Sequence, residues 1–161
     1  MKRIPLTKGK EALADDEDYE YLMKWKWHAA TGGQYAARDG RSSDRRHGGM
    51  IYMHRAVAER MGLKPAATID HRNGNKLDNR RSNLRPATQS EQEGNCRLRA
   101  DNRSGYRGVT WDKQTGRWRA QIGIGGRHIC LKRFDDPKDA ARAYNKAALR
   151  YFGEFAFLNP V

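Results

Sequence analysis

Residues 68–95 contain the pattern that most limits how this chain can fold: an adjacent Asp–His pair, a turn-rich loop and a helix start. Neighbouring side chains on an extended strand point to opposite faces, so Asp70 and His71 can address different partners. One of them can hold a metal ion while the other contacts a water molecule. The following loop is rich in Asn, Asp and Gly, which tolerate left-handed backbone and bond within their own turns. We therefore expect a tight loop that returns close to the pair.

A helix start follows this loop. Thr88 with Glu91 three residues later has the pattern of a capping box, in which two side chains satisfy backbone N–H groups reciprocally. The short helix predicted here carries Gln92 and Asn95 on adjacent turns. A strand, a loop and a helix are thus expected to converge on His71.

The overall charge indicates the class of partner. The net charge is +13 at pH 7, and a basic surface of this kind attracts nucleic acid and releases its counterions on binding. No stretch approaches the ~20 apolar residues of a membrane-spanning helix, and the N-terminus lacks the apolar segment of a secretory signal. We expect an intracellular, cytoplasmic protein without a membrane partner. Cys96 and Cys130 lie far apart and give neither a zinc pattern nor a disulfide framework.

The N-terminal residues predict a helix and a hairpin. Asp15 and Asp18 fit the N-cap and third position of a helix, where the helix dipole stabilises acidic side chains; a metal site is the alternative interpretation. Trp25 and Trp27 precede a turn at residues 31–34, which indicates a hairpin with both tryptophans buried.

A polar loop, a short strand and a helix are expected next, at residues 40–49, 50–53 and 54–61. The arginines of the loop can follow a phosphate backbone or remain solvated; they are Arg41, Arg45 and Arg46. His54, at the start of the helix, is interpreted as structural rather than catalytic.

The segment 68–95 resembles the HNH nuclease family, in the form found in phage and intron-encoded homing endonucleases. The matching residues are Asp70, His71, Gly74, Asn75, Asn79, Asn83, Leu84, Arg85, Thr88, Gln89 and Asn95. The resemblance implies that His71 is the general base that deprotonates a water molecule and that Asn83 belongs to the catalytic set by orienting it. It also implies that Asp70 binds a divalent metal ion, magnesium or manganese, at the scissile phosphate.

The third letter of the motif departs from the family. Where the family usually has Asn or His as the second protein ligand, this chain has Gln92. An amide oxygen can bind magnesium, but the extra methylene of Gln displaces that oxygen by more than the ~0.2 Å that such sites tolerate. Asn95, one turn further on, is the alternative ligand, and both residues remain candidates.

Residues 105–161 predict three strands followed by one helix. The strands are expected at residues 106–111, 117–124 and 127–134, joined by turns at 112–116 and 125–126. In the second strand, apolar and polar side chains alternate: Trp118, Ala120, Ile122 and Ile124 on one face, and Arg117, Arg119 and Gln121 on the other. Ile129 and Leu131 are expected to face inward from the third strand. Asp136 caps a helix whose first residue is Pro137, and Gly153 ends it.

Four segments of this region, YRGVTW, GRWRAQI, FDDPKDAARAYNKAA and FGEFAFLN, resemble the plant ethylene-response-factor domain of the Apetala type. That family lays a three-stranded antiparallel sheet in the DNA major groove, with the helix behind it. The predicted DNA-binding residues here and in the preceding segment are Arg97, Arg99, Arg107, Arg117, Arg119, Gln121, Arg127, His128 and Lys132. Arg107 and Val109 are two positions apart, so on a regular strand their side chains would point to the same face. For Arg107 to face DNA while Val109 faces the core, the strand needs a twist or bulge at Gly108. Thr110, Thr115 and Cys130 depart from the plant pattern, so its GC-rich target does not transfer.

These observations together predict an α+β protein with two modules. Residues 1–95 are expected to form an N-terminal α+β region containing a small ββα-metal HNH module, with its motif at 68–95. A basic linker at 96–104 leads to a DNA-binding domain at 105–161, a three-stranded antiparallel sheet packed on one helix.

The function predicted from these modules is a metal-dependent, site-preferring DNA endonuclease of phage or mobile-element type. It would hydrolyse a phosphodiester bond in double-stranded DNA and, as a single site, nick one strand. One alternative is a DNA-binding regulator with an inactive HNH module, suggested by Gln92. Another is an RNA-binding protein, since basic sheets also bind RNA, but the second strand directs Trp118 to the core instead of exposing a stacking aromatic.

Overall fold

The computed structural model describes residues 1–40, 49–64, 68–96, 98 and 102–161. Helices and strands are mixed along the chain, which confirms the expected α+β class. The loop arginines expected to follow phosphate, Arg41, Arg45 and Arg46, lie outside the described residues. Among the described residues, no helix is both long enough and apolar enough to cross a membrane.

The chain divides into two compact units, residues 1–87 and 88–161. The division falls before the short helix α3 (Gln89–Gly94), so this helix packs with the second unit. The domain boundary expected after residue 95 stays a prediction. Each unit is described below by itself.

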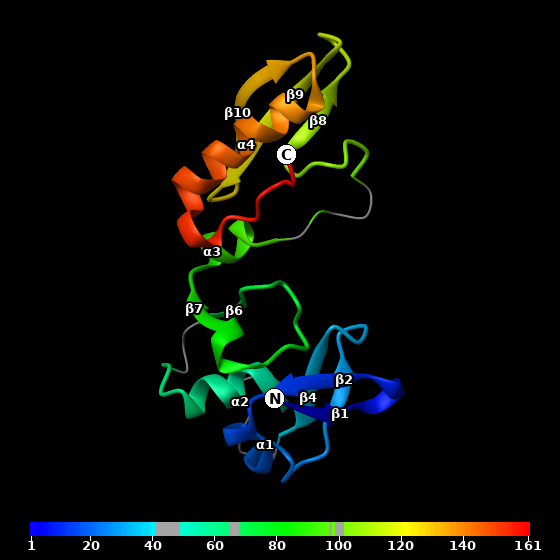
Figure 1. Cartoon of the computed structure of the whole chain (residues 1–161), viewed down its shortest axis with the longest axis vertical. Helices are drawn as coiled ribbons and strands as arrows, with labels where there is room; N and C mark the ends of the chain where they lie inside the picture. The colour runs from blue at the N-terminus through cyan, green and yellow to red at the C-terminus, as the bar shows by residue number, and fades with distance from the viewer. Residues whose placement is uncertain (41–48, 65–67, 97, 99–101) are drawn as a thin grey trace. The chain divides into compact units, whose positions relative to one another are not determined.

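The first unit contains short strands and helices. Its elements in chain order are β1 (Lys2–Pro5), η1 (Thr7–Gly9), β2 (Glu11–Ala14), α1 (Asp16–Leu22), β3 (His28–Ala30), β4 (Tyr35–Asp39), β5 (Met50–Tyr52), α2 (Met53–Arg60), β6 (Thr68–His71), η3 (Arg81–Asn83) and β7 (Leu84–Ala87). Its described strands form three antiparallel sheets, β1-β2, β3-β4-β5 and β6-β7 (Figure 1). The strand and helix expected at residues 50–61 are observed as β5 and α2.

The core of the first unit is apolar and draws on most of its elements. Ile4, Leu22, Met53 and Val57 are almost completely buried in one cluster. Trp27 joins them, and its indole Nε1 donates to the Leu22 carbonyl at 2.8 Å. The expected burial of both tryptophans is therefore only partly correct, because Trp25 is half-buried.

The predicted helix near residue 15 is confirmed, but its acidic residues have unexpected partners. Helix α1 begins after Asp15, whose carboxylate accepts the backbone N–H of Arg81 at 2.8 Å and makes no cap bond to the helix. Asp18 is completely buried and binds the guanidinium groups of Arg60 at 2.6 Å and Arg81 at 2.7 Å. Burial raises the pKa of Asp18, but bonds and charges from Arg81 and Arg60 lower it further, leaving it below its usual value.

The second unit contains a sheet and its covering helix. Its elements are α3, β8 (Val109–Asp112), β9 (Arg117–Ile124), β10 (Arg127–Phe134), α4 (Pro137–Phe152) and η4 (Gly153–Phe155). The strands form an antiparallel sheet in the order β10-β9-β8, with α4 packed along it (Figure 1). The predicted limits of α4 are confirmed: Asp136 accepts the N–H of Lys138 at 2.7 Å, Pro137 begins the helix and Gly153 follows it.

Two local features change the predicted strands of this sheet. The first strand begins at Val109, not residue 106, because Gly108 adopts a φ of 71°. A Cβ at Gly108 would lie 2.1 Å from the Tyr144 ring, so only glycine fits this approach. The twist expected at Gly108 is thus observed. In β10, a register shift follows Cys130. Ile129 pairs with the buried Ile122, on the face toward α4 as expected, but is 41% exposed on this edge strand.

Candidate active site and nucleic-acid interface

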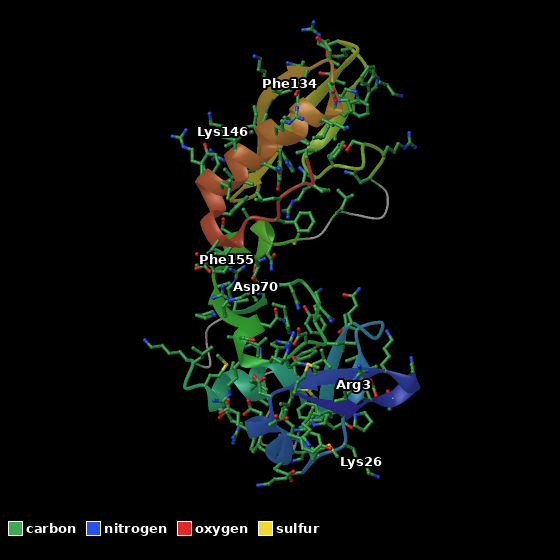
Figure 2. All side chains as sticks on the ribbon, in the orientation of Figure 1. Arg3, Lys26, Asp70, Phe134, Lys146 and Phe155 are labelled. Atoms are coloured by element: carbon green, nitrogen blue, oxygen red, sulfur yellow. The ribbon has the colours of Figure 1, made fainter. Side chains whose placement is uncertain are left out.

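Strands β6 and β7 hold the Asp–His pair in the first unit. Asp70 lies opposite Arg85 and His71 lies opposite Leu84 in this antiparallel ladder. Asp70 and His71 are only 8% and 5% exposed, so both polar side chains are enclosed by the fold (Asp70 is labelled in Figure 2). Buried polar groups need partners, and the surrounding residues provide them.

The partner of Asp70 is a buried arginine that sequence reasoning missed. Arg85 contacts the Asp70 Oδ2 atom through Nε at 3.0 Å and Nη2 at 2.9 Å. The Arg85 side chain is 6% exposed, so this is a buried ion pair. Both contacts go to one carboxylate oxygen, which fixes the orientation of Asp70. The sequence marked Arg85 only as a residue of the motif, and the pairing of β6 with β7 places it opposite Asp70.

His71 contacts the amide of Asn79 across the loop. The His71 Nε2 atom lies 3.4 Å from Asn79 Oδ1. The Asn79 amide is oriented by its own nitrogen, which donates to the Leu77 carbonyl at 3.2 Å and to the Met53 sulfur at 3.5 Å. Because Oδ1 can only accept, the matching imidazole tautomer carries its proton on Nε2 and its lone pair on Nδ1.

The surroundings of His71 keep it neutral. Burial lowers the pKa of His71, outweighing the Asn79 contact and the charges of Asp70 and Asp78, which raise it. The net pKa is below the usual value for histidine. A neutral imidazole at pH 7 can accept a proton, which is the state a general base requires.

A group of rings packs beside His71. The His54 ring centroid lies 5.3 Å from that of His71, and the Tyr35 centroid lies 6.3 Å away. His54 also stacks on Tyr52 at 5.6 Å. Burial, followed by the charges of His71 and Arg55, lowers the pKa of His54 to about 3. These contacts favour the interpretation of His54 as a packing residue. No pattern in the sequence had indicated that Tyr35 lies beside His71.

Asn83 ties together the two ends of the loop after His71. Its Oδ1 accepts the backbone N–H of Asn73 at 3.0 Å, and its Nδ2 donates to the Asp78 carbonyl at 2.7 Å. Asn83 is 6% exposed, so these bonds are shielded from water. Since Asn79 follows Asp78, the bonds of Asn83 help to hold the amide beside His71.

The same loop is also fixed to β2. The Leu13 N–H donates to the Leu77 carbonyl at 2.8 Å, and the Asn79 N–H donates to the Leu13 carbonyl at 2.8 Å. Asp78 binds the Arg80 guanidinium at 2.6 Å, and this hydrogen bond is the main reason that the pKa of Asp78 lies below its usual value. The tight loop that the sequence predicted is thus held at several points.

The two candidate second ligands lie on α3. The predicted capping box is observed, with Thr88 and Glu91 bonding reciprocally. Gln92 is half-buried on this helix and Asn95 ends it. Both residues belong to the second unit, so their role as ligands together with Asp70 stays a prediction. The donors offered, one carboxylate and amide oxygens, have the hard oxygen chemistry that suits magnesium and manganese.

The sheet of the second unit has a polar face opposite α4, here called the outer face. Strand register and alternation assign it Thr110, Asp112, Arg117, Arg119, Gln121, His128, Cys130 and Arg133. The opposite face is the packed one: Ala120 and Ile122 are buried against residues of α4. The alternation predicted for β9 is therefore confirmed.

Polar atoms on the outer face are left unsatisfied. The Thr110 Oγ1 and Arg119 Nε atoms are buried and have no hydrogen-bond partner in the described part of the chain. A cavity of about 690 Å³ within the second unit includes Thr110, Gln121 and His128 in its lining. Buried polar atoms without partners mark a surface that an external ligand can complete.

The predicted DNA-binding residues do not all lie on the outer face. Arg117, Arg119, Gln121 and His128 do. Arg127 pairs with Ile124, and Lys132 pairs with Ala120 after the register shift. Because paired residues lie on the same face of a sheet, Arg127 and Lys132 belong to the face toward α4. The Lys132 ammonium lies 5.7 Å from the Phe134 ring, on that same face (Phe134 is labelled in Figure 2).

Three further predicted DNA-binding residues are accounted for differently. Arg97 and Arg99 lie outside the described residues. Arg107 is half-buried, and its guanidinium contacts backbone carbonyls at the end of α3. Arg133 was not among the predicted DNA-binding residues, but it lies on the outer face and binds Asp112 at 2.8 Å.

Comparisons with known proteins identify two families that match successive parts of the chain. The HNH endonuclease family matches residues 51–93, and the AP2 domain family matches residues 104–154. An uncharacterised HNH endonuclease of Acanthamoeba polyphaga mimivirus is 27% identical over 157 residues, which are 96% of this chain and 77% of the viral protein. No solved structure matches the chain.

The plant relatives match only the C-terminal part. An APETALA2-like protein of rice (Oryza sativa) is 45% identical over 56 residues, 35% of this chain and 13% of the rice protein. An AP2-like ethylene-responsive transcription factor of Arabidopsis thaliana is 45% identical over 56 residues, 35% of this chain and 12% of that protein. This chain therefore covers only a small part of these relatives. Successive parts of this chain thus match an HNH endonuclease domain, at residues 51–93, and an AP2 domain, at residues 104–154.

Proposed function

We propose that this chain is a metal-dependent, site-preferring DNA endonuclease of the homing type, from a phage or another mobile element. It hydrolyses a phosphodiester bond in double-stranded DNA, and its single HNH site nicks one strand. The observation that carries the proposal is the buried, neutral His71, held beside Asp70 by a network of loop amides. The match of the HNH endonuclease family to residues 51–93 supports it.

His71 acts as the general base. Its lowered pKa keeps the imidazole unprotonated at neutral pH, so it can take a proton from an attacking water molecule. In the tautomer that donates from Nε2 to Asn79, Nδ1 would accept this proton. Asn83 contributes by bonding both ends of the loop that carries Asn79.

Asp70 would be the first protein ligand of a magnesium or manganese ion, with Gln92 or Asn95 as the second. When bound, the metal ion stabilises the charge that develops on the phosphate and on the departing 3′ oxygen. The donors fit such an ion because carboxylate and amide oxygens are the ligands it prefers. Arg85 holds the Asp70 carboxylate through Oδ2, which limits its rotation in the buried site.

The AP2 domain binds the duplex through its outer face. Arginine can read guanine and glutamine can read adenine in the major groove, and Arg119 and Gln121 offer these groups side by side on β9. The buried, unpartnered Arg119 Nε and Thr110 Oγ1 atoms would gain partners there. The net charge of +13 strengthens binding to phosphates.

A supercoiled-plasmid assay tests the proposal. Wild-type protein with magnesium or manganese is expected to produce nicked circles, and a chelator should abolish them. The His71→Ala variant should lose about 10²- to 10⁴-fold in rate, the contribution typical of a general base, while it still binds duplex DNA. His28→Ala, on β3, is the matched control and should cleave like the wild type.

A second candidate function is a DNA-binding regulator whose HNH domain is inactive. The observation that favours it is Gln92, which stands where the family usually has Asn or His. Tight duplex binding without cleavage under either metal ion would support the regulator and refute the nuclease. RNA that outcompetes duplex DNA at the same salt concentration would refute both.

A further inference from the structure

The C-terminal end of α3 is bound by a single arginine side chain. The Arg107 guanidinium donates to the backbone carbonyls of Gly94, at 2.8 Å, and of Glu93 and Cys96. The last carbonyls of a helix have no partner within the helix, and the negative end of its dipole attracts cations. Arg107 satisfies both needs. At least three of its five N–H donors are directed at backbone oxygens.

The backbone of Arg107 is itself fixed. The Arg107 N–H donates to Asn159 Oδ1 at 2.7 Å, and the Asn159 Nδ2 donates to the Arg107 carbonyl at 3.1 Å. Asn159 is 5% exposed and is held in turn by Asn145 of α4 through two bonds, of 2.8 and 2.9 Å. A continuous set of hydrogen bonds therefore runs from α4 through Asn159 and Arg107 to α3.

Close packing holds the same end of α3 independently. A Cβ at Gly94 would lie 2.7 Å from the Phe152 ring, so the helix backbone rests directly on the end of α4. The Phe157 N–H donates to the Gly94 carbonyl at 3.0 Å, which is the carbonyl that Arg107 also binds. Helix α3 is therefore an integral part of the second unit.

We infer that Arg107 is a positioning residue that fixes α3 within the second unit, and that it does not read DNA bases. Helix α3 carries Gln92 and ends at Asn95, the candidate metal ligands, so this inference rests on the proposed function. The unit that binds DNA would thereby also fix the orientation of a part of the cleavage machinery. The resemblance to the plant DNA-binding domain had suggested that Arg107, like Arg119, faces DNA.

Arg107 and Arg119 differ in how far the protein itself satisfies their N–H donors. The guanidinium of Arg107 has three backbone acceptors and lies 5.9 Å from the ring of the buried Tyr144. The Nε atom of Arg119 is buried without a partner in the described chain. Arg107 is thus satisfied within the protein, whereas Arg119 still has an N–H to donate.

Hydrogen exchange and DNA binding, measured on the full chain, separate the two roles. In Arg107→Ala, the amides of residues 89–96 should exchange at least about tenfold faster, the factor expected from losing one charge-assisted hydrogen bond. Affinity for a mixed-sequence duplex should stay within about threefold of wild type, as expected for removing one partly screened charge. Arg119→Ala, the matched control, should leave this exchange unchanged and weaken binding about tenfold or more.

The Arg107→Lys variant guards against a simple folding defect. Lysine keeps the charge but cannot bridge three carbonyls, so residues 89–96 should again exchange faster while duplex affinity is retained. If the chain nicks DNA, both Arg107 variants should also need more manganese for half-maximal nicking.

The inference is overturned if Arg107→Ala weakens DNA binding as much as Arg119→Ala while residues 89–96 keep their protection. These readouts do not depend on cleavage. A failure of the nuclease proposal in the plasmid assay can therefore be told apart from a failure of this inference.

Discussion

The HNH site and the outer face of the AP2 sheet are both polar, but they are built in opposite ways. In the HNH site, Asp70, His71, Asn79 and Asn83 are each less than 10% exposed. Asp70 is bound to Arg85 of β7, and the other three side chains are bound to one another or to the loop. On the outer face, Arg117 is exposed and the buried Arg119 Nε atom has no partner in the described chain.

The difference indicates how each surface would work. A catalytic group acts best when its orientation is fixed before the reaction, so that no reorganisation is needed during the chemical step. A reading surface gains its affinity from partners that arrive with the ligand. The internal bonds of the first site and the unsatisfied atoms of the second are what these two tasks require.

The largest expected effect concerns the buried ionic network of the first unit. Asp18→Asn removes the charge that Arg60 and Arg81 share, and it leaves both guanidinium groups near a neutral amide. Losing one partner of a fully buried ion pair costs about 3–5 kcal/mol, and the lower end, about 3 kcal/mol, applies here because the Arg60 and Arg81 side chains are 34% and 28% exposed. We expect this loss in the free energy of unfolding of the first unit, measured by urea denaturation. Because Arg81 lies in η3 with Asn83, hydrogen exchange in the following β7 should also rise.

Asp112→Asn is the matched control for this network. It removes the carboxylate partner of Arg133 in the second unit, where the Arg133 side chain is 44% exposed to water. Exposed pairs contribute little because water screens them. If both variants shift the urea midpoint equally, the proposed contrast between a buried and a solvated network is wrong.

The next effect is a loss of stability in acid. His54 has a pKa of about 3 in the folded chain, because burial disfavours its charged form, against about 6.5 when unfolded. The unfolded chain therefore binds more protons between these values, and stability falls as pH decreases through 6.5. Between pH 6.5 and 5 the loss from His54 is about 2 kcal/mol. The pKa of His71 is also lowered, so it acts in the same direction.

His54→Phe tests this dependence. The phenyl ring can retain the stacking on Tyr52 and cannot titrate, so stability should fall less steeply with acid than in the wild type. Urea denaturation at several pH values between 7 and 5 measures the slope. An unchanged slope would show that His54 is not the buried neutral group described here.

Elements with local signals were predictable from the sequence. The capping box at Thr88, the turn at residues 125–126 and the start of α4 at Pro137 each depend on a few neighbouring residues, and each is observed. The loop after His71 was also expected, because its Asn and Gly residues favour tight turns. The general position of the candidate site followed from the same local patterns.

Contacts between distant residues were not predictable in this way. The pairing of Arg85 with Asp70 and the contacts of Arg107 with the end of α3 depend on how strands and helices pack, which no local pattern encodes. The burial of Asp18 between Arg60 and Arg81 is a third case, since each arginine is more than 40 positions from Asp18 along the chain. Each is a polar partner found across the fold rather than along the chain.

The register of β10 is the clearest feature that could not be predicted from the sequence. Alternation along residues 127–134 placed Lys132 among the DNA-binding residues. The shift after Cys130 inserts an extra residue, so Lys132 lies opposite Ala120 and Arg133 lies opposite Arg119. A β-bulge reverses the alternation beyond it, and it depends on the pairing of two strands, so one strand's sequence does not reveal it.

The smallest expected effect tests this register. Arg133→Ala should weaken duplex binding by about 1–3 kcal/mol if Arg133 makes a groove contact from the outer face beside Arg119. Lys132→Ala removes the same charge from the neighbouring position, where the ammonium lies over the Phe134 ring, and should weaken binding less. Titrations at one salt concentration make the two variants comparable, because both lose one cation. A larger loss for Lys132→Ala would mean that strand alternation continues unbroken through Leu131, and that the outer face includes Lys132 in place of Arg133.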